Sequence, residues 1–135
     1  MENTTESRRR VLVADDEPHI GRIIKMKLEH GPFEVTLVYD GKEAIEAIGR
    51  ETPPYDLALL DLMMPELSGL DVLEWIRQSP QQDMAAVILT AAGQDEQQQA
   101  AMKAGATAFI TKPFSPKKLY ALVASLTGVE AEDGE

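Results

Sequence analysis

The sequence predicts a doubly wound α/β domain built on a five-stranded parallel sheet. Along the 135 residues, short apolar runs alternate five times with stretches of helical periodicity. The runs are apolar throughout, which is typical of strands buried on both faces of a parallel sheet. Regular alternation of strands and helices favours right-handed crossovers, which lay helices on both sides of such a sheet. A chain of this length suits one domain.

Each element has its own local signal. The five apolar runs that predict strands are residues 11–14, 33–38, 57–60, 86–89 and 108–110. A helical stretch follows each of these runs. The first and fourth stretches are residues 18–30 and 95–104. The second is capped by Asp40 and ends at Arg50, the third begins at Ser68, and the fifth begins at Ser115.

Capping and breaking residues mark the helix ends. Pro18 suits the first turn of the first helix, which Asp16 or Glu17 can cap. Ser68 with an aspartate three residues later predicts a short capping box at the start of the third helix. Gly128 closes the fifth helix.

Apolar periodicity predicts which helix faces point inward. In the first helix the inward face is Ile20, Ile23, Ile24 and Leu28, and in the fifth it is Leu119, Leu122, Val123 and Leu126. The three glutamines at 97–99 predict an exposed face on the fourth helix, and Tyr120 is expected to border that face.

Composition excludes several classes of protein. The chain has no cysteine and therefore no disulfide framework or thiolate metal site. No apolar run is long enough for a transmembrane helix, and the first ten residues lack a signal-peptide core. The net charge of −10 argues against binding to nucleic acid or anionic lipid through the whole surface. We expect a cytoplasmic protein with no direct nucleic-acid or membrane contact.

Polar side chains follow the strands where the strands end. Asp15 and Asp16 follow the first strand, Asp61 the third, Thr90 the fourth and Lys112 the fifth. Ligands of doubly wound sheets bind outside these carboxyl ends. Neighbouring carboxylates raise one another's pKa values, and a hard divalent cation such as Mg²⁺ removes that penalty. Acids, a lysine and a hydroxyl together suit phosphoryl transfer to a carboxylate.

Each of these residues has a plainer interpretation when taken alone. An Asp-Asp pair after a strand often forms only a turn and a helix cap, and Lys112 before a proline can be a solvated turn. The prediction therefore depends on their combination at one edge of the sheet.

The same residues, in the same order, resemble the CheY-like receiver domain of two-component response regulators. The resemblance is carried by VLVADDEP at 11–18, LLDLMMPELSGLD at 59–71, ILTA at 88–91, AGA at 104–106 and FITKPF at 109–114. It implies the flavodoxin-like (βα)5 fold. It also implies a receiver domain at 9–127, between a flexible N-terminus at 1–8 and an acidic flexible tail at 128–135.

The resemblance assigns a role to each site residue. Asp61 is implied to accept a phosphoryl group, which Lys112 contacts and Thr90 hydrogen-bonds. Phe109 is implied to be an aromatic switch that changes rotamer with Thr90. The Mg²⁺ ligands would be Asp16, Asp61 and the carbonyl of Met63, with Asp15 binding directly or through water. The resemblance also implies a cis peptide between Lys112 and Pro113.

The implied function is a signalling switch, not an enzyme acting on external substrates. The phosphodonor would be a sensor histidine kinase or a phosphotransfer protein. The surface of the fourth helix, fifth strand and fifth helix would respond and bind a downstream protein or effector domain. Met63 and Ala92 lack polar groups that could orient an attacking water, so we expect slow self-dephosphorylation. The protein would be a monomer or a phosphorylation-dependent dimer.

Two alternatives stay open at this point. A Mg²⁺-dependent phosphohydrolase with an aspartate nucleophile usually has an Asp-x-Asp pair, but the second position after Asp15 is Glu17. A phosphorylation-independent pseudo-receiver usually lacks the acid pair, the phosphoacceptor or the lysine, and all are present here.

Overall fold

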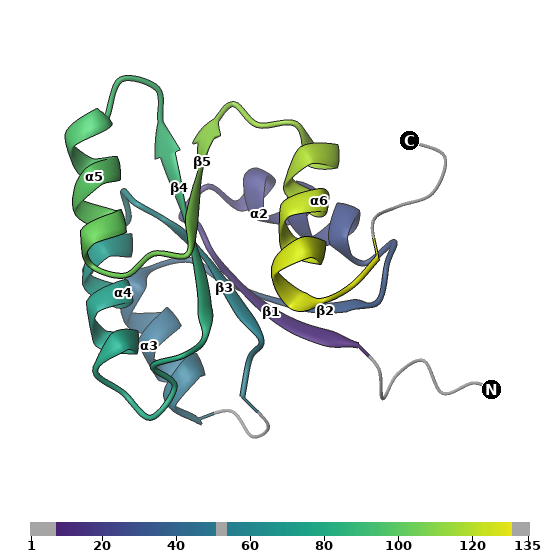
Figure 1. The fold of residues 1–135 in the computed structure, drawn as a ribbon, viewed down its shortest axis with the longest axis horizontal. Helices are drawn as coiled ribbons and strands as arrows, with labels where there is room; N and C mark the ends of the chain where they lie inside the picture. Colours follow the sequence, from purple (N-terminus) through teal and green to yellow (C-terminus); the bar gives the residue numbers. More distant parts are fainter. Residues whose placement is uncertain (1–7, 51–53, 131–135) are drawn as a thin grey trace.

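The structure is a computed structural model that describes residues 8–50 and 54–130, and it has the predicted α/β architecture (Figure 1). Five parallel strands form one sheet in the order β2-β1-β3-β4-β5. The strands are β1 (Arg9–Ala14), β2 (Phe33–Val38), β3 (Leu57–Asp61), β4 (Ala85–Ala91) and β5 (Ala108–Lys112). The helices are α2 (Pro18–Leu28), α3 (Gly41–Arg50), α4 (Gly69–Arg77), α5 (Asp95–Lys103) and α6 (Pro116–Thr127). The predicted doubly wound parallel sheet is confirmed.

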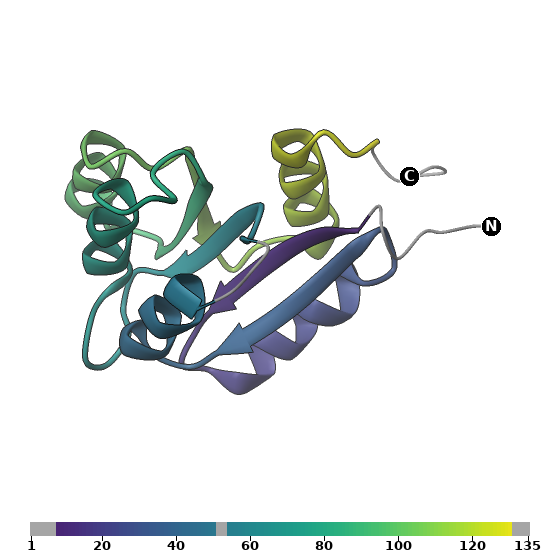
Figure 2. The ribbon, with the colours of Figure 1, turned by 90° about the horizontal axis from the view of Figure 1, so that it is seen from below.

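The sheet separates two hydrophobic cores. Helices α3, α4 and α5 cover one face, and α2 and α6 cover the other (Figures 1 and 2). Because successive strand residues point to opposite faces, Leu12, Leu60 and Ile88 belong to the core under α3–α5. Their neighbours in sequence, such as Leu59 and Leu89, belong to the core under α2 and α6. The central strands are therefore buried on both sides, as continuous apolar runs predict.

Strands β3, β4 and β5 extend past their apolar runs. Asp61, Thr90 and Lys112 were expected to follow the strands, but they lie within the hydrogen-bonded ladders. Backbone pairing does not depend on side-chain polarity, so a ladder can continue where the hydrophobic signal stops. As a result, the rigid sheet holds these polar side chains directly.

The predicted helix caps are present in α4 and α6. Ser68 and Asp71 form the complete capping box of α4. Ser115 caps α6, and Gly128 ends it in the left-handed conformation with φ 77°. Glu17 occupies the N-cap position of α2 but makes no capping bond with its side chain. Its backbone N–H instead donates to Asp15 Oδ1 at 2.9 Å.

Two expectations about helix faces are wrong. Ile23 is 43% exposed, because the buried positions of α2 are Gly21, Ile24 and Leu28, a narrower stripe than the apolar pattern predicts. Tyr120 is buried and packs edge-on against Phe33, with 5.5 Å between ring centroids. Gly31 makes room for this ring, because a Cβ at that position would overlap the tyrosine hydroxyl.

Most of the predicted flexible ends, 1–8 and 128–135, lies outside the described residues. Within the described residues, no helix is both long enough and apolar enough to cross a membrane.

Candidate functional site

Strand register brings the predicted carboxylates together. Ala14 of β1 pairs with Leu60 of β3. Asp15, which follows Ala14, and Asp61, which follows Leu60, therefore lie side by side. One oxygen atom from each of Asp15, Asp16 and Asp61 lies within 4.8 Å of the others. Asp15 and Asp61 are buried, whereas Asp16 is exposed. The three acids thus form a cluster at the carboxyl edge, open to solvent on the side of Asp16.

Lys112 enters this cluster from β5. Its Nζ lies 3.0 Å from Asp61 Oδ2, 3.1 Å from Asp15 Oδ2 and 3.2 Å from Glu17 Oε1. The next peptide bond, between Lys112 and Pro113, is cis, as the resemblance implied. One cation thus faces three anionic side chains, and the site keeps negative charge even with the lysine in place.

The electrostatics of Asp61 and Lys112 reflect this excess. Burial and the Asp15 carboxylate raise the pKa of Asp61 from 3.8 to about 6, although its hydrogen bond to Lys112 acts in the opposite direction. Burial alone would lower the pKa of Lys112, but its hydrogen bond to Asp61 and the negative charges of Asp61 and Asp15 outweigh burial and raise that pKa. The lysine is therefore held in its charged form. The positive charge of Lys112 is not enough to bring the pKa of Asp61 down to its ordinary value, so a further cation would stabilise the ionised carboxylate.

The residues fit a hard divalent cation. Asp15 Oδ2 is fully enclosed and accepts no hydrogen bond from the described residues, with Lys112 Nζ as its charge partner. A buried carboxylate oxygen with unsatisfied acceptor capacity is costly, and a bound cation relieves that cost. The available donors are carboxylate oxygens, which hard divalent cations prefer. The cluster is therefore compatible with metal binding.

The loop after β3 fixes the carboxylate of Asp61. The Met63 N–H donates to Asp61 Oδ1 at 3.2 Å, and the Gly69 N–H donates to the Leu62 carbonyl at 3.0 Å. Gly69 is required at the start of α4, because a Cβ there would overlap the backbone carbonyl oxygen of Asp61. Met63 is 62% exposed, whereas Asp61 is only 6% exposed.

Thr90 lies near the carboxyl end of β4, and Phe109 lies near the start of the neighbouring strand β5. Thr90 is 1% exposed, and it pairs in register with Thr111 of β5. Phe109 is 39% exposed and lines a groove next to α5. The structure brings the predicted site residues together at the carboxyl edge of the sheet, except Phe109, which lies three residues before Lys112 on β5.

Sequence reasoning missed two contacts in this region. Glu17 was noted after the first strand, but its ion pair with Lys112 was not expected, since the two residues are 95 positions apart. Gln98 was expected to lie on an exposed face, but it is half-buried and its Nε2 donates to Thr90 Oγ1 at 3.0 Å. The periodicity of α5 could have indicated Gln98, because it lies three residues before Ala101, the buried residue of that helix.

The family described as the response regulator receiver domain matches residues 11–124. The chain belongs to this family. It is a receiver domain of the kind found in two-component systems, and receiver domains are signalling domains.

Relatives of this receiver domain agree with that assignment. The response regulator ArlR of Staphylococcus saprophyticus is 36% identical over 87% of this chain and 51% of its own length. The transcriptional regulatory protein ResD of Bacillus subtilis is 38% identical over 93% of this chain and 50% of its own. The receiver domain spans about half the length of the curated relatives it matches.

Solved receiver structures share the fold. The receiver domain of Francisella response regulator 1452 superposes with a TM-score of 0.82 at 35% identity, covering 90% of this chain and 98% of that one. The BeF3-activated DrrB receiver domain gives a TM-score of 0.78 at 26% identity, covering 88% and 97%.

Proposed function

We propose that this receiver domain accepts a phosphoryl group on Asp61 from the phosphohistidine of a sensor histidine kinase or a phosphotransfer protein. The observation that carries the proposal is the contact of Lys112 Nζ with Asp61, at 3.0 Å, inside a cluster of further carboxylates. A lone lysine–aspartate pair would be an ordinary ion pair. A pair enclosed by excess negative charge suits a site that takes up a cation and a phosphoryl group together.

The phosphoryl transfer needs no external base, because the ionised carboxylate of Asp61 is itself the nucleophile. A carboxylate oxygen of Asp61 forms a bond to phosphorus while the bond between phosphorus and the donor imidazole nitrogen breaks. The electron pair of that bond leaves with the imidazole. Lys112, whose raised pKa keeps it protonated, places its positive charge against the phosphoryl oxygens. The acyl phosphate then replaces the carboxylate as a partner of the lysine.

The metal in this proposal is Mg²⁺. Asp15, Asp16, Asp61 and the Met63 carbonyl would hold it, with Asp15 binding directly or through water. When bound, Mg²⁺ supplies charge that neutralises the phosphoryl oxygens as they approach the acids. Met63 and Ala92 offer no polar side-chain atom to orient an attacking water, so the acyl phosphate is expected to hydrolyse slowly.

The switch would pass through Thr90 and Phe109. The Thr90 hydroxyl donates a hydrogen bond to a phosphoryl oxygen and draws the loop after β4 inward. The exposed ring of Phe109 then turns toward the space that Thr90 leaves. Phosphorylation biases an equilibrium between two arrangements, for which differential contacts of a few kcal/mol are enough.

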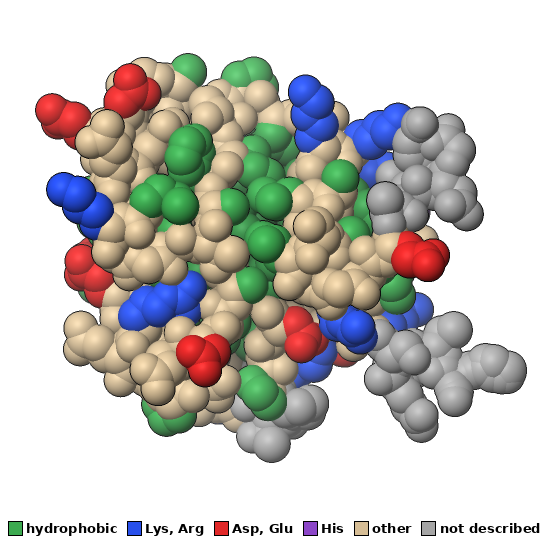
Figure 3. All heavy atoms as spheres, viewed as in Figure 1, with side chains coloured by type: hydrophobic (Ala, Val, Ile, Leu, Met, Phe, Trp, Pro, Cys, Tyr) green, Lys and Arg blue, Asp and Glu red, His purple; other side chains and the backbone are tan. Residues whose placement is uncertain are grey.

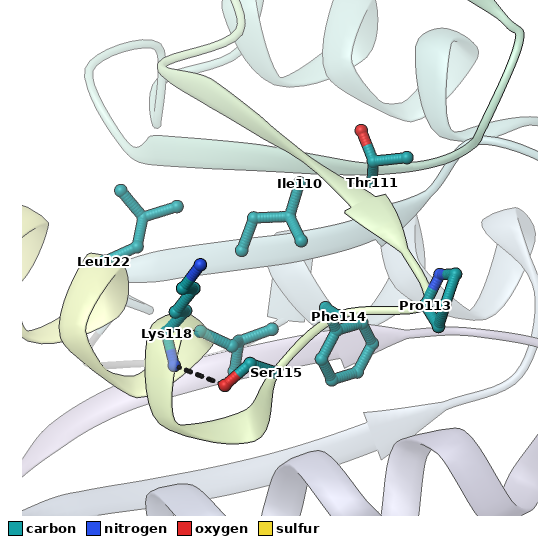
Figure 4. Close-up of a pocket in the computed structure, with 8 residues that line it drawn as sticks. Ile110, Thr111, Pro113, Phe114, Ser115, Lys118 and Leu122 are labelled. Carbon is teal, nitrogen blue, oxygen red and sulfur yellow. Dashed lines mark hydrogen bonds between the residues drawn. The ribbon is translucent and has the colours of Figure 1, made fainter.

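The surface that would respond consists of α5, β5 and α6, which are the fourth helix, fifth strand and fifth helix of the chain. Hydrophobic side chains gather over β5 between the two helices (Figure 3). A groove of about 530 Å³ lies on the α5 side and is lined by Met102 and Phe109. A groove of about 520 Å³ lies on the α6 side, where Ile110 and Leu122 come from opposite walls (Figure 4). A downstream protein, an effector domain or a second copy would bind this face after phosphorylation.

The test is the mass of the intact protein after incubation with Mg²⁺ and acetyl phosphate. We expect a gain of one phosphoryl mass that a chelator prevents and that Asp61→Asn abolishes. Asp71→Asn is a matched control, because Asp71 is an exposed capping aspartate outside the cluster. No gain in folded, Mg²⁺-loaded protein would refute the proposal and favour a phosphorylation-independent pseudo-receiver.

A further inference from the structure

One glutamine connects helix α5 to the buried hydroxyl of Thr90. Gln98 Nε2 donates to Thr90 Oγ1 at 3.0 Å, and among the described residues it is the only side chain that hydrogen-bonds this hydroxyl. A second glutamine, Gln94, accepts the Ala91 N–H at 2.9 Å through its side-chain oxygen. The end of β4 is therefore tied to the start of α5 by two glutamine side chains.

The direction of the Thr90 side chain explains this bond. Thr90 lies two residues after Ile88, which packs in the core under α3–α5, so Thr90 points to the same face of the sheet. By the same alternation, Asp61 and Lys112 point to the face of Leu59 and Ile110, which pack in the core under α2 and α6. In this state the hydroxyl is turned toward α5 and away from the charged cluster.

Helix α5 has few other attachments. Of its nine residues, all of which are described, Ala101 is buried, Gln98 is half-buried and the others are exposed. In contrast, α4 and α6 each bury four residues. Gln98 lies one turn before Ala101 and lines the same groove as Phe109. Gln98 is therefore, with Ala101, one of the two residues of α5 that are not exposed, and it stands next to the proposed aromatic switch.

We propose that Gln98 is a positioning residue that holds the Thr90 hydroxyl toward α5 while Asp61 is unmodified. When a phosphoryl group forms on Asp61, Thr90 turns toward it. The bond between Thr90 and Gln98 then breaks, because Gln98 and the phosphoryl group lie on opposite faces of the sheet and one hydroxyl cannot reach both. This releases the first half of α5 beside Phe109. The inference rests on the proposed function, since a phosphoryl group on Asp61 must compete for Thr90.

Replacing Gln98 with leucine is expected to shift the equilibrium between the unmodified and the activated arrangement. Gln98→Leu keeps the approximate size of the side chain and a good helix former but removes the donor. The unmodified arrangement then loses one hydrogen bond, whereas the activated arrangement loses none. The net worth of such a bond corresponds to a factor of about 2 to 10 in an equilibrium constant. We expect Gln98→Leu to favour the activated arrangement by this factor.

The probe is beryllofluoride, with Mg²⁺, as a stable substitute for a phosphoryl group on Asp61. The dissociation constant is measured by calorimetry for the wild type, Gln98→Leu and the control Gln97→Leu, which changes a neighbouring exposed glutamine of the same helix. We expect Gln98→Leu to bind about 2 to 10 times more tightly and Gln97→Leu to bind like the wild type. In a Thr90→Val background, the effect of Gln98→Leu is expected to disappear.

A second readout does not depend on phosphorylation. In the free protein, Thr90→Val is expected to shift the NMR resonance of the Gln98 side-chain amide and to leave those of Gln97 and Gln99 in place. If that resonance does not move, or if Gln98→Leu binds beryllofluoride no better than Gln97→Leu, the inference is overturned while the proposed function stands. If the wild type binds no beryllofluoride, the proposed function fails and the inference fails with it.

Discussion

Replacing Asp61 with asparagine is expected to stabilise the metal-free protein at neutral pH. The reason is the raised pKa of this acid, about 6 in the folded chain against an ordinary value of 3.8. A carboxyl group whose pKa is higher in the folded state is ionised at a cost when the chain folds at pH 7. Asparagine has nearly the same shape and an oxygen that can still accept the Met63 N–H, but it carries no charge.

The magnitude follows from the shift. One pKa unit corresponds to about 1.4 kcal/mol, so a shift of about two units would give roughly 3 kcal/mol without screening. Solvent on the side of Asp16 and the lost ion pair with Lys112 reduce this gain, and we expect about 1 to 2 kcal/mol. In a domain of this size, that is a rise in Tm of roughly 5 °C.

The assay is thermal or urea unfolding in a chelator between pH 4 and pH 8. Above about pH 7 the gain from Asp61→Asn is expected to be complete. It should shrink as the pH falls through about 6, where Asp61 becomes protonated in the folded chain, and only a small part of it should remain at pH 4, close to the ordinary pKa of 3.8. Glu74→Gln, which removes an exposed negative charge from α4, controls for net charge alone.

Two results would refute this reasoning. One is an Asp61→Asn variant no more stable than the wild type at pH 7. The other is a gain that grows as the pH falls. Adding Mg²⁺ provides a further check, because it is expected to stabilise the wild type by mass action and to stabilise the variant much less.

Three further predictions concern single residues. Gly69→Ala is expected to destabilise the fold by about 1 to 3 kcal/mol in urea unfolding, because its Cβ would overlap the carbonyl of Asp61. Gly49→Ala is the contrasting control, expected to stabilise by about 0.5 to 1 kcal/mol, because its Cβ meets nothing closer than 3.8 Å in a helix. Ser68→Ala is expected to cost about 1 kcal/mol through loss of the capping box, and an unchanged urea midpoint would contradict that. The phosphorylated wild type is expected to lose its phosphoryl group over minutes or longer. Met63→Asn is expected to lose it severalfold faster, because the asparagine amide can orient an attacking water. Decay of the phosphorylated wild type within seconds would count against this.

The parts of the fold that could be predicted are those encoded locally. Apolar runs and caps such as Ser68 and Ser115 indicated the order of elements, and strand order in a doubly wound sheet then placed Asp15, Asp61 and Lys112 at one edge. Each of these signals lies within a few residues of the element that it defines. They were sufficient for the architecture and for the cluster of charged residues at the carboxyl edge, whereas the roles of Met63 and Phe109 were implied only by the resemblance to receiver domains.

The errors concern contacts between distant segments. Tyr120 is buried because Gly31, in another part of the chain, leaves space for its ring, and no local pattern contains that fact. The ion pair between Glu17 and Lys112 depends on how two loops meet. Gln98 is one of three identical neighbours, and only the rotation of α5 relative to β4 distinguishes it from Gln97 and Gln99.

The sparse packing of α5 also has an evolutionary consequence. Seven of its nine side chains are exposed, and surface substitutions away from special features usually change stability by less than about 0.5 kcal/mol. Mutations at the exposed positions can therefore alter the charge and shape of this helix almost freely, provided that Ala101 still fits the core and Gln98 keeps its bond to Thr90. A receiver built in this way can acquire a new binding partner through changes in one short segment, while the residues that handle the phosphoryl group remain as they are.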